Sequence, residues 1–122
     1  MTVDIYNTDK KYNIIYADPP WSYNDKMHGH SFSLEHEYQT VANLGKWTMG
    51  NVELCLLGIK GKPNKFRIDK TVKQLVIAER TSHSKKPDEV RKRIVQGFGD
   101  IPRIELFARQ YADGWDCWGN EV

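Results

Sequence analysis

The pattern of apolar and polar positions predicts four short strands along this chain. Residues 13–17 (NIIYA) are a β-prone run that stops at two prolines, which cannot continue a central strand. Residues 53–59 (ELCLLGI) and 74–79 (QLVIAE) are near-continuous apolar runs of strand length, as is typical of strands covered on both faces of a parallel sheet. Residues 103–108 (RIELFA) give a fourth strand.

The clearest helical pattern runs from Pro87 to Phe98. Proline suits a first helical position, where its missing N–H has no partner to lose, and Asp88 and Glu89 suit the positive end of the helix dipole. An apolar stripe repeats every four residues, three basic residues lie off it, and glycines close the helix. The stripe is Val90, Ile94 and Phe98 with Val95 beside them, the basic residues are Arg91, Lys92 and Arg93, and the glycines are Gly97 and Gly99.

The remaining segments carry weaker patterns. Residues 34–41 suggest a short helix, and residues 113–122 are aromatic and rich in turn residues. The order strand, loop, strand, strand, helix, strand predicts a single α/β domain of three layers over residues 1–122.

Composition narrows the class of protein. The chain has 122 residues, enough for one core, and its net charge of +2 permits a nucleic-acid partner without arguing for one. Cys55 and Cys117 form no CxxC pair and fit no zinc spacing, so we expect free thiols in a reducing cytoplasm and no metal site. No apolar run approaches the ~20 residues of a membrane span, and residues 1–11 do not resemble a signal peptide.

The segment Asp18-Pro19-Pro20-Trp21 is the strongest chemical signal because it follows a predicted buried strand directly. An exocyclic amine of adenine is a poor nucleophile, and in-plane acceptors that bind its hydrogens draw the nitrogen toward tetrahedral geometry. A carboxylate and the carbonyl of a proline supply two such acceptors, and an aromatic neighbour can stack on the base. By itself, the same tetrapeptide is also compatible with a simple turn.

At this point the chain resembles a known family, the N6-adenine methyltransferases with the Asp-Pro-Pro-Trp motif (MT-A70-like), and within it the short bacterial and phage members. Four blocks carry the resemblance in the family's order: residues 11–21 (KYNIIYADPPW), 45–61 (GKWTMGNVELCLLGIKG), 82–91 (SHSKKPDEVR) and 103–121 (RIELFARQYADGWDCWGNE). The resemblance implies a Rossmann-like α/β fold and methyl transfer from S-adenosylmethionine to adenine in DNA or RNA.

The resemblance also assigns roles to single residues. Asp18, Pro19, Pro20 and Trp21 are expected to form the catalytic loop. The expected cofactor-binding residues are Lys86, Phe107, Arg109, Asn120 and Glu121, and the pair Asp4-Ile5 is a weaker match to another cofactor segment. Each has a simpler reading: Lys86 as a solvated lysine, Phe107 as a core residue, and Arg109 as the ion-pair partner of Glu105 or of an aspartate in the tail.

Other candidate residues fit no particular site. His28, His30, His36 and His83 have no metal-ligand spacing and are expected in loops. Trp47 and Trp115 are compatible with core residues and with stacking platforms, and the core is favoured. A basic stretch surrounds Phe66 and is equally compatible with phosphate contacts and with a solvated loop. Its members are Lys60, Lys62, Lys65, Arg67, Lys70 and Lys73.

The chain departs from the family between residues 40 and 44, where the family has several tens of residues that form a central strand, helix and strand. We therefore expect a reduced Rossmann-like S-adenosylmethionine-dependent methyltransferase domain with that segment missing. Three interpretations stay open: an adenine methyltransferase acting on DNA rather than RNA, completed by homo- or hetero-dimerisation; an inactive remnant or non-catalytic subunit that binds cofactor or nucleic acid; and an unrelated small regulatory protein.

Overall fold

The computed structural model describes residues 1–19, 43–44, 49–50, 52–81 and 85–122. The chain divides into two compact units, of which the first joins Met1–Pro20 to Phe98–Val122 and the second holds Trp21–Gly97. Among the described residues, no helix has the length and apolar character needed to cross a membrane.

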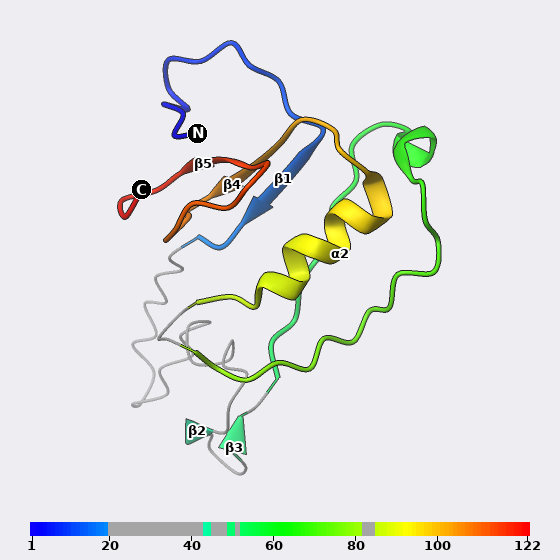
Figure 1. The fold of residues 1–122 in the computed structure, drawn as a ribbon, viewed down its shortest axis with the longest axis vertical. Helices are drawn as coiled ribbons and strands as arrows, with labels where there is room; N and C mark the ends of the chain where they lie inside the picture. Colours follow the sequence, from blue (N-terminus) through cyan, green and yellow to red (C-terminus); the bar gives the residue numbers. More distant parts are fainter. Residues whose placement is uncertain (20–42, 45–48, 51, 82–84) are drawn as a thin grey trace, which may run out of the picture. The chain divides into compact units, whose positions relative to one another are not determined.

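A parallel sheet of three strands organises the first unit (Figure 1). Its order is β1 (Ile14–Ala17), β4 (Arg103–Leu106) and β5 (Asp116–Trp118), with Ile14 opposite Arg103 and Ile104 opposite Asp116. The strands expected at 13–17 and 103–108 are therefore confirmed. β5 was not predicted, because its three residues lie among glycines and aspartates that favour turns.

The core of the first unit lies around β4 and β5. Ile104 and Cys117 are almost completely buried, and Val3, Ala108 and Trp115 surround them. The expectation that Trp115 belongs to the core is confirmed: its ring meets the Tyr16 ring edge to face at 6.1 Å. Trp47 lies outside the described residues. Cys55 and Cys117 are both free thiols, as expected.

The second unit contains an antiparallel pair, β2 (Asn43–Leu44) with β3 (Met49–Gly50), a short 3-10 helix η1 (Pro63–Phe66), and most of α2 (Asp88–Phe98). The helix predicted over 87–98 is thus confirmed, with Pro87 just before its first residue. The helix expected over 34–41 falls outside the described residues.

The side chains that are buried along α2 are not only those of the apolar stripe predicted from the sequence. Val90, Ile94 and Phe98 are half-buried, whereas Arg91 is buried although it lies off the stripe. The Arg91 guanidinium donates to the Asp88 carboxylate one turn earlier at 2.9 Å, an ion pair that offsets part of the desolvation of the charge.

The end of α2 is held by a neighbouring loop. The backbone N–H groups of Ile68 and Asp69 donate to the carbonyl of Gly97 at 2.8 and 3.3 Å. The Asp69 carboxylate accepts from Gln96 at 2.8 Å and from the backbone and hydroxyl of Thr71. The two bonds to Gly97 satisfy a helix-terminal carbonyl that has no partner within the helix itself, and the Asp69 contacts hold the loop in place.

The strands predicted over 53–59 and 74–79 do not form, and this part of the prediction is wrong. A strand needs a neighbour to accept its backbone hydrogen bonds, and in the part of the chain that is described none pairs with either run. In the second run, Arg93 of α2 donates instead to the carbonyls of Lys73 and Leu75 at 2.8 and 2.5 Å. The apolar side chains of both runs are largely exposed.

Candidate functional site

All three strands of the first unit point in the same direction, so the segments that follow them share one edge of the sheet. Asp18 and Pro19 follow β1, Phe107 follows β4, and Gly119 follows β5. We call this edge, with residues 18–19, 107–109 and 119–121, the carboxyl edge. Ligands of open parallel sheets bind at the carboxyl ends of the strands, so the fold brings together most of the residues predicted to act.

The segments after β4 and β5 are clamped to each other. The Ala108 N–H donates to the Trp118 carbonyl at 3.0 Å, and the backbone of Gly119 lies directly against that of Ala108. A Cβ atom at position 119 would stand 2.8 Å from the Ala108 nitrogen. Only glycine permits this approach, and the clamp fixes residues 107–109 beside residues 119–121.

Phe107 has a left-handed backbone, with φ of 59°, which is uncommon for any residue other than glycine. Such a conformation costs on the order of 1–2 kcal/mol and persists where surrounding contacts impose it. Here those contacts are the clamp at Ala108 and an edge-to-face packing of the Phe107 ring on Trp118, with centroids 5.2 Å apart. Phe107 is half-buried, so part of its ring is accessible at the carboxyl edge.

Arg109 and Glu121, both predicted to contact the cofactor, lie together. The guanidinium is 3.3 Å from the carboxylate, and the two side chains are 48% and 56% exposed. The sequence suggested Glu105 or an aspartate of the tail as the partner of Arg109, and Glu121 takes that place. Asn120, next in the same segment, is exposed. An exposed ion pair of this kind contributes little to stability, so both groups remain available to a ligand.

The chain start adds a fourth segment to the carboxyl edge. Thr2 bridges to Cys117 in parallel, and the Val3 N–H donates to the Cys117 carbonyl at 2.9 Å. A turn follows in which the Asp4 carboxylate accepts from the Tyr6 N–H at 3.0 Å and from the Asn7 amide at 2.5 Å. Both bonds lower the pKa of the Asp4 carboxyl, and the bond from Asn7 has the larger effect.

Two aromatic residues at this edge were not predicted. The exposed Tyr6 ring meets Trp118 edge to face at 5.9 Å, and Trp118 thus contacts both Tyr6 and Phe107. The tryptophan belongs to the short strand β5 that the turn-rich tail concealed. A signal for it existed in the spacing Trp115-Asp116-Cys117-Trp118, where alternate residues are buried and half-buried as in a strand.

The predicted catalytic loop is described only in its first half. Asp18 and Pro19 are half-buried, and the Asp18 N–H reaches the carbonyl of Leu106, the last residue of β4, at 3.5 Å, which continues the pairing one residue past the end of β1. Pro20 and Trp21 lie outside the described residues. The aspartate is thus fixed at the carboxyl edge by its own backbone.

Lys86 belongs to the second unit, where it forms an ion pair with Glu53. Only 14% of the lysine side chain and 18% of the glutamate side chain are exposed, so Lys86 is not one more solvated lysine. Its contact joins the segment before α2 to the start of the apolar run 53–59.

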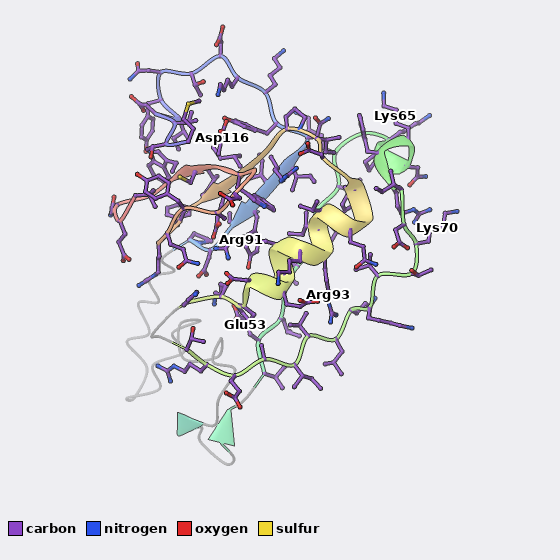
Figure 2. The ribbon with its side chains drawn as sticks, in the orientation of Figure 1. Glu53, Lys65, Lys70, Arg91, Arg93 and Asp116 are labelled. Atoms are coloured by element: carbon purple, nitrogen blue, oxygen red, sulfur yellow. The ribbon has the colours of Figure 1, made fainter. Side chains whose placement is uncertain are left out.

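Other sequence candidates are less informative. The four histidines fall outside the described residues, and the basic stretch 60–73 has every lysine and arginine side chain exposed, with Lys65 over the Phe66 ring at 5.0 Å (Figure 2). Within the described residues, no group of three or more His, Cys, Asp and Glu is placed to hold a metal ion.

The opposite, amino edge of the same sheet carries a partly buried polar network. The Tyr12 hydroxyl donates to Asp116 at 2.7 Å, and Lys10 donates to the same oxygen at 3.2 Å. The hydrogen bond from Tyr12 is the largest cause that lowers the pKa of the Asp116 carboxyl, and the contact with Lys10 lowers it further. Desolvation, followed by the same hydrogen bond, raises the pKa of the Tyr12 hydroxyl to about 12. This network fixes β5 to the segment before β1.

The comparisons with known proteins bear directly on this arrangement. The model of the MT-A70 family matches residues 32–121, most of the chain and all of β4 and β5. The chain belongs to the MT-A70 family. The matched range contains Lys86, Phe107, Arg109, Asn120 and Glu121, and it begins after the Asp18 segment.

Several individual proteins are also similar in sequence to this MT-A70 chain. It is 27% identical to the type II methyltransferase M.MunI of Mycoplasma sp over 183 aligned positions, which cover 93% of the chain and 78% of the relative. It is 37% identical to the N(6)-adenosine-methyltransferase MT-A70-like of Arabidopsis thaliana and 35% identical to the human N(6)-adenosine-methyltransferase catalytic subunit METTL3. Those two alignments cover 64% of the chain and only 11% and 14% of the larger relatives.

Proposed function

We propose that this MT-A70 chain binds S-adenosylmethionine at the carboxyl edge and directs methyl transfer to the exocyclic amine of adenine. The observation that carries the proposal is the convergence of three strand ends. The parallel order β1-β4-β5 puts Asp18 and Pro19, Phe107 and Arg109, and Asn120 and Glu121 at one edge of one sheet.

The donor set at this edge fits the cofactor chemically. S-adenosylmethionine has a planar adenine, ribose hydroxyls, and an amino-acid end that carries both charges. Phe107 offers an aromatic ring, Asn120 an amide, and Arg109 with Glu121 a cation and an anion that are both exposed. When bound, the cofactor supplies the electrophilic methyl group.

The residues after β1 supply the other half of the reaction. The Asp18 carboxylate and the Pro19 carbonyl are two hydrogen-bond acceptors in consecutive residues, and Pro19 has no N–H that would compete for the target. Acceptors held in the plane of the base orient its amine and increase electron density on the nitrogen, so orientation provides much of the rate enhancement. This step needs no covalent intermediate on the protein.

The proposed substrate is adenine in DNA, with RNA as the alternative. DNA is favoured because the sequence resembles the short bacterial and phage members of the family. The exposed basic stretch 60–73 offers charge for contacts with the phosphates of either nucleic acid. An adenine within a duplex has to leave the base stack to reach the carboxyl edge.

We further propose that residues 1–122 form one methyltransferase-like domain of Rossmann-like type in which a central segment is missing. The alignment with the Mycoplasma relative supports this, because it spans 183 positions and the chain has 122 residues. At least 61 positions of that relative, all inside the alignment, therefore have no counterpart here. The second candidate function, an inactive chain that retains cofactor or nucleic-acid binding, rests on the same observation.

The test begins with calorimetric titration of the whole protein with S-adenosylmethionine and a thermal melt alongside. Saturable binding with a raised melting temperature supports the cofactor site. Incubation with labelled cofactor and adenine-containing DNA or RNA oligonucleotides then separates enzyme from remnant. Absence of cofactor binding by a cooperatively folded protein would overturn the proposal, and binding without methyl transfer would favour the second candidate.

A further inference from the structure

A pocket of about 400 Å³ lies at the amino edge of the three-stranded sheet, opposite the carboxyl edge. It is lined by residues that begin β1, β4 and β5 or come just before them, so the whole pocket belongs to the first unit. Three cationic and two anionic side chains line it. They are Lys10, Lys11, Arg103, Asp100 and Asp116. The proposed methyl transfer uses none of them.

Arg103, the first residue of β4, is the buried charge of this pocket. Only 6% of its side chain is exposed, and its guanidinium lies over the Trp115 ring at 5.4 Å. One terminal nitrogen donates to the Asp100 carboxylate at 2.8 Å and to the Ile101 carbonyl at 3.2 Å. The buried Nε–H has no acceptor among the described residues. Because buried polar groups almost always have a partner, this donor points to an acceptor from outside the chain.

The remaining charges leave the pocket with an excess of positive charge. The Asp100 carboxylate is paired with Arg103, and the Asp116 carboxylate is paired with Lys10 at 3.2 Å. Both anions of the pocket therefore already have a cation. Lys11 is exposed and forms no ion pair in the part of the chain that the structure describes. The pocket thus combines a buried N–H donor with an ammonium group that has no anion.

We propose that this pocket binds a phosphate group through Arg103 and Lys11. A phosphate has several oxygens that can accept from two donors at once, and the guanidinium of arginine suits their geometry. Gly114 also lines the pocket, and a Cβ atom there would collide with Nη2 of Arg103, so glycine leaves room beside the guanidinium. The phosphate is either a free anion or part of a nucleic-acid backbone, and its chemistry in the pocket is the same.

The test follows the NMR signal of the Arg103 Nε–H while inorganic phosphate is titrated into the full 122-residue protein. Chloride at the same ionic strength is the reference, and we expect a saturable shift with phosphate alone. Lys11→Ala should weaken phosphate binding roughly threefold, as fits the loss of one exposed charge contact. Asp100→Asn should strengthen it roughly threefold, because the variant removes the carboxylate that competes for Arg103.

Two matched controls separate the pocket from an effect of net charge. Lys62 and Glu79 are exposed and belong to the second unit. Lys62→Ala and Glu79→Gln change the net charge by the same amounts as Lys11→Ala and Asp100→Asn, and both should bind phosphate as the parent protein does. If the folded parent shows no saturable shift, or if each pocket variant binds phosphate as its control does, the proposal is wrong.

A second titration identifies the source of the phosphate. An oligothymidylate contains no adenine, so it presents the backbone without the methyl acceptor. If it displaces inorganic phosphate, the pocket holds a backbone phosphate; if inorganic phosphate binds and the oligonucleotide does not compete, the ligand is a free anion. Either result supports the site.

The inference is independent of the proposed function, because the two sites lie at opposite edges of the sheet. Lys11→Ala and Asp100→Asn should therefore bind S-adenosylmethionine as the parent protein does. Cofactor binding without phosphate binding would overturn the inference alone, and phosphate binding without cofactor binding would overturn the proposed function alone.

Discussion

Replacing Gly119 with alanine should separate the two segments that form most of the candidate cofactor site. The added Cβ would stand 2.8 Å from the Ala108 nitrogen, 3.1 Å from the Phe107 carbonyl carbon, and closer still to the Ala108 carbonyl oxygen. All three are backbone atoms and cannot rotate away, so the segments after β4 and β5 have to move apart. Overpacking of this kind costs about 1–3 kcal/mol.

For a chain of this size each kcal/mol lowers the melting temperature by roughly 4 °C, so we expect a fall of about 4–12 °C. The same displacement moves Arg109 away from Asn120, and S-adenosylmethionine should bind about tenfold more weakly, which corresponds to ~1.4 kcal/mol. Thermal melts and calorimetric titration measure the two effects independently.

The chain offers a matched control in Gly58, where an added Cβ would meet no atom within 4 Å. Gly58→Ala should leave the melting temperature unchanged or raise it slightly, because alanine reduces the entropy of the unfolded chain. If Gly119→Ala melts at the same temperature as Gly58→Ala and binds cofactor equally well, the clamp does not act as we describe.

Three more predictions concern single side chains. Asp18→Ala should abolish methyl transfer to adenine and keep the melting temperature, and turnover equal to that of the exposed control Asp9→Ala would refute the role of Asp18. Arg109→Ala should weaken cofactor binding with little change in stability, because the exposed pair with Glu121 contributes at most about 1 kcal/mol, and an unchanged dissociation constant would remove Arg109 from the site. Tyr12 has a raised pKa of about 12, so its contribution is complete below pH 10 and is lost as the pH rises from about 10 toward 12. After solvent screening of this half-buried pair the loss is on the order of 1 kcal/mol, and melts across that range should show a loss that Tyr12→Phe lacks.

The sequence predicted those elements whose stability is local or whose partners lie within the chain. The helix at 88–98 carries its own start and stop signals, and β1 and β4 combine β-prone residues with partners that are present. β5 was not predicted because its three residues give too short a pattern among the turn residues around Gly114 and Gly119, and pairing with β4 stabilises them nonetheless.

The strands predicted over 53–59 and 74–79 do not form, for the opposite reason. Their composition is that of buried strands, but pairing is a property of two segments, and a pattern in one of them does not reveal whether the other exists. For the site, the resemblance assigned Arg109 and Glu121 to cofactor binding, which stays a prediction, and the structure shows that the two side chains form an ion pair. The left-handed backbone of Phe107 has no sequence signature, because aromatic residues rarely adopt it.

The pairing of β1 with β4 has a consequence for chain entropy. About 85 residues, from 18 to 102, separate the two strands, and closing such a loop costs an entropy that grows only with the logarithm of its length. Lengthening this connection by about 60 residues would add about 0.5 kcal/mol. The free energy of pairing β1 with β4 is therefore almost independent of how much chain passes between the two strands.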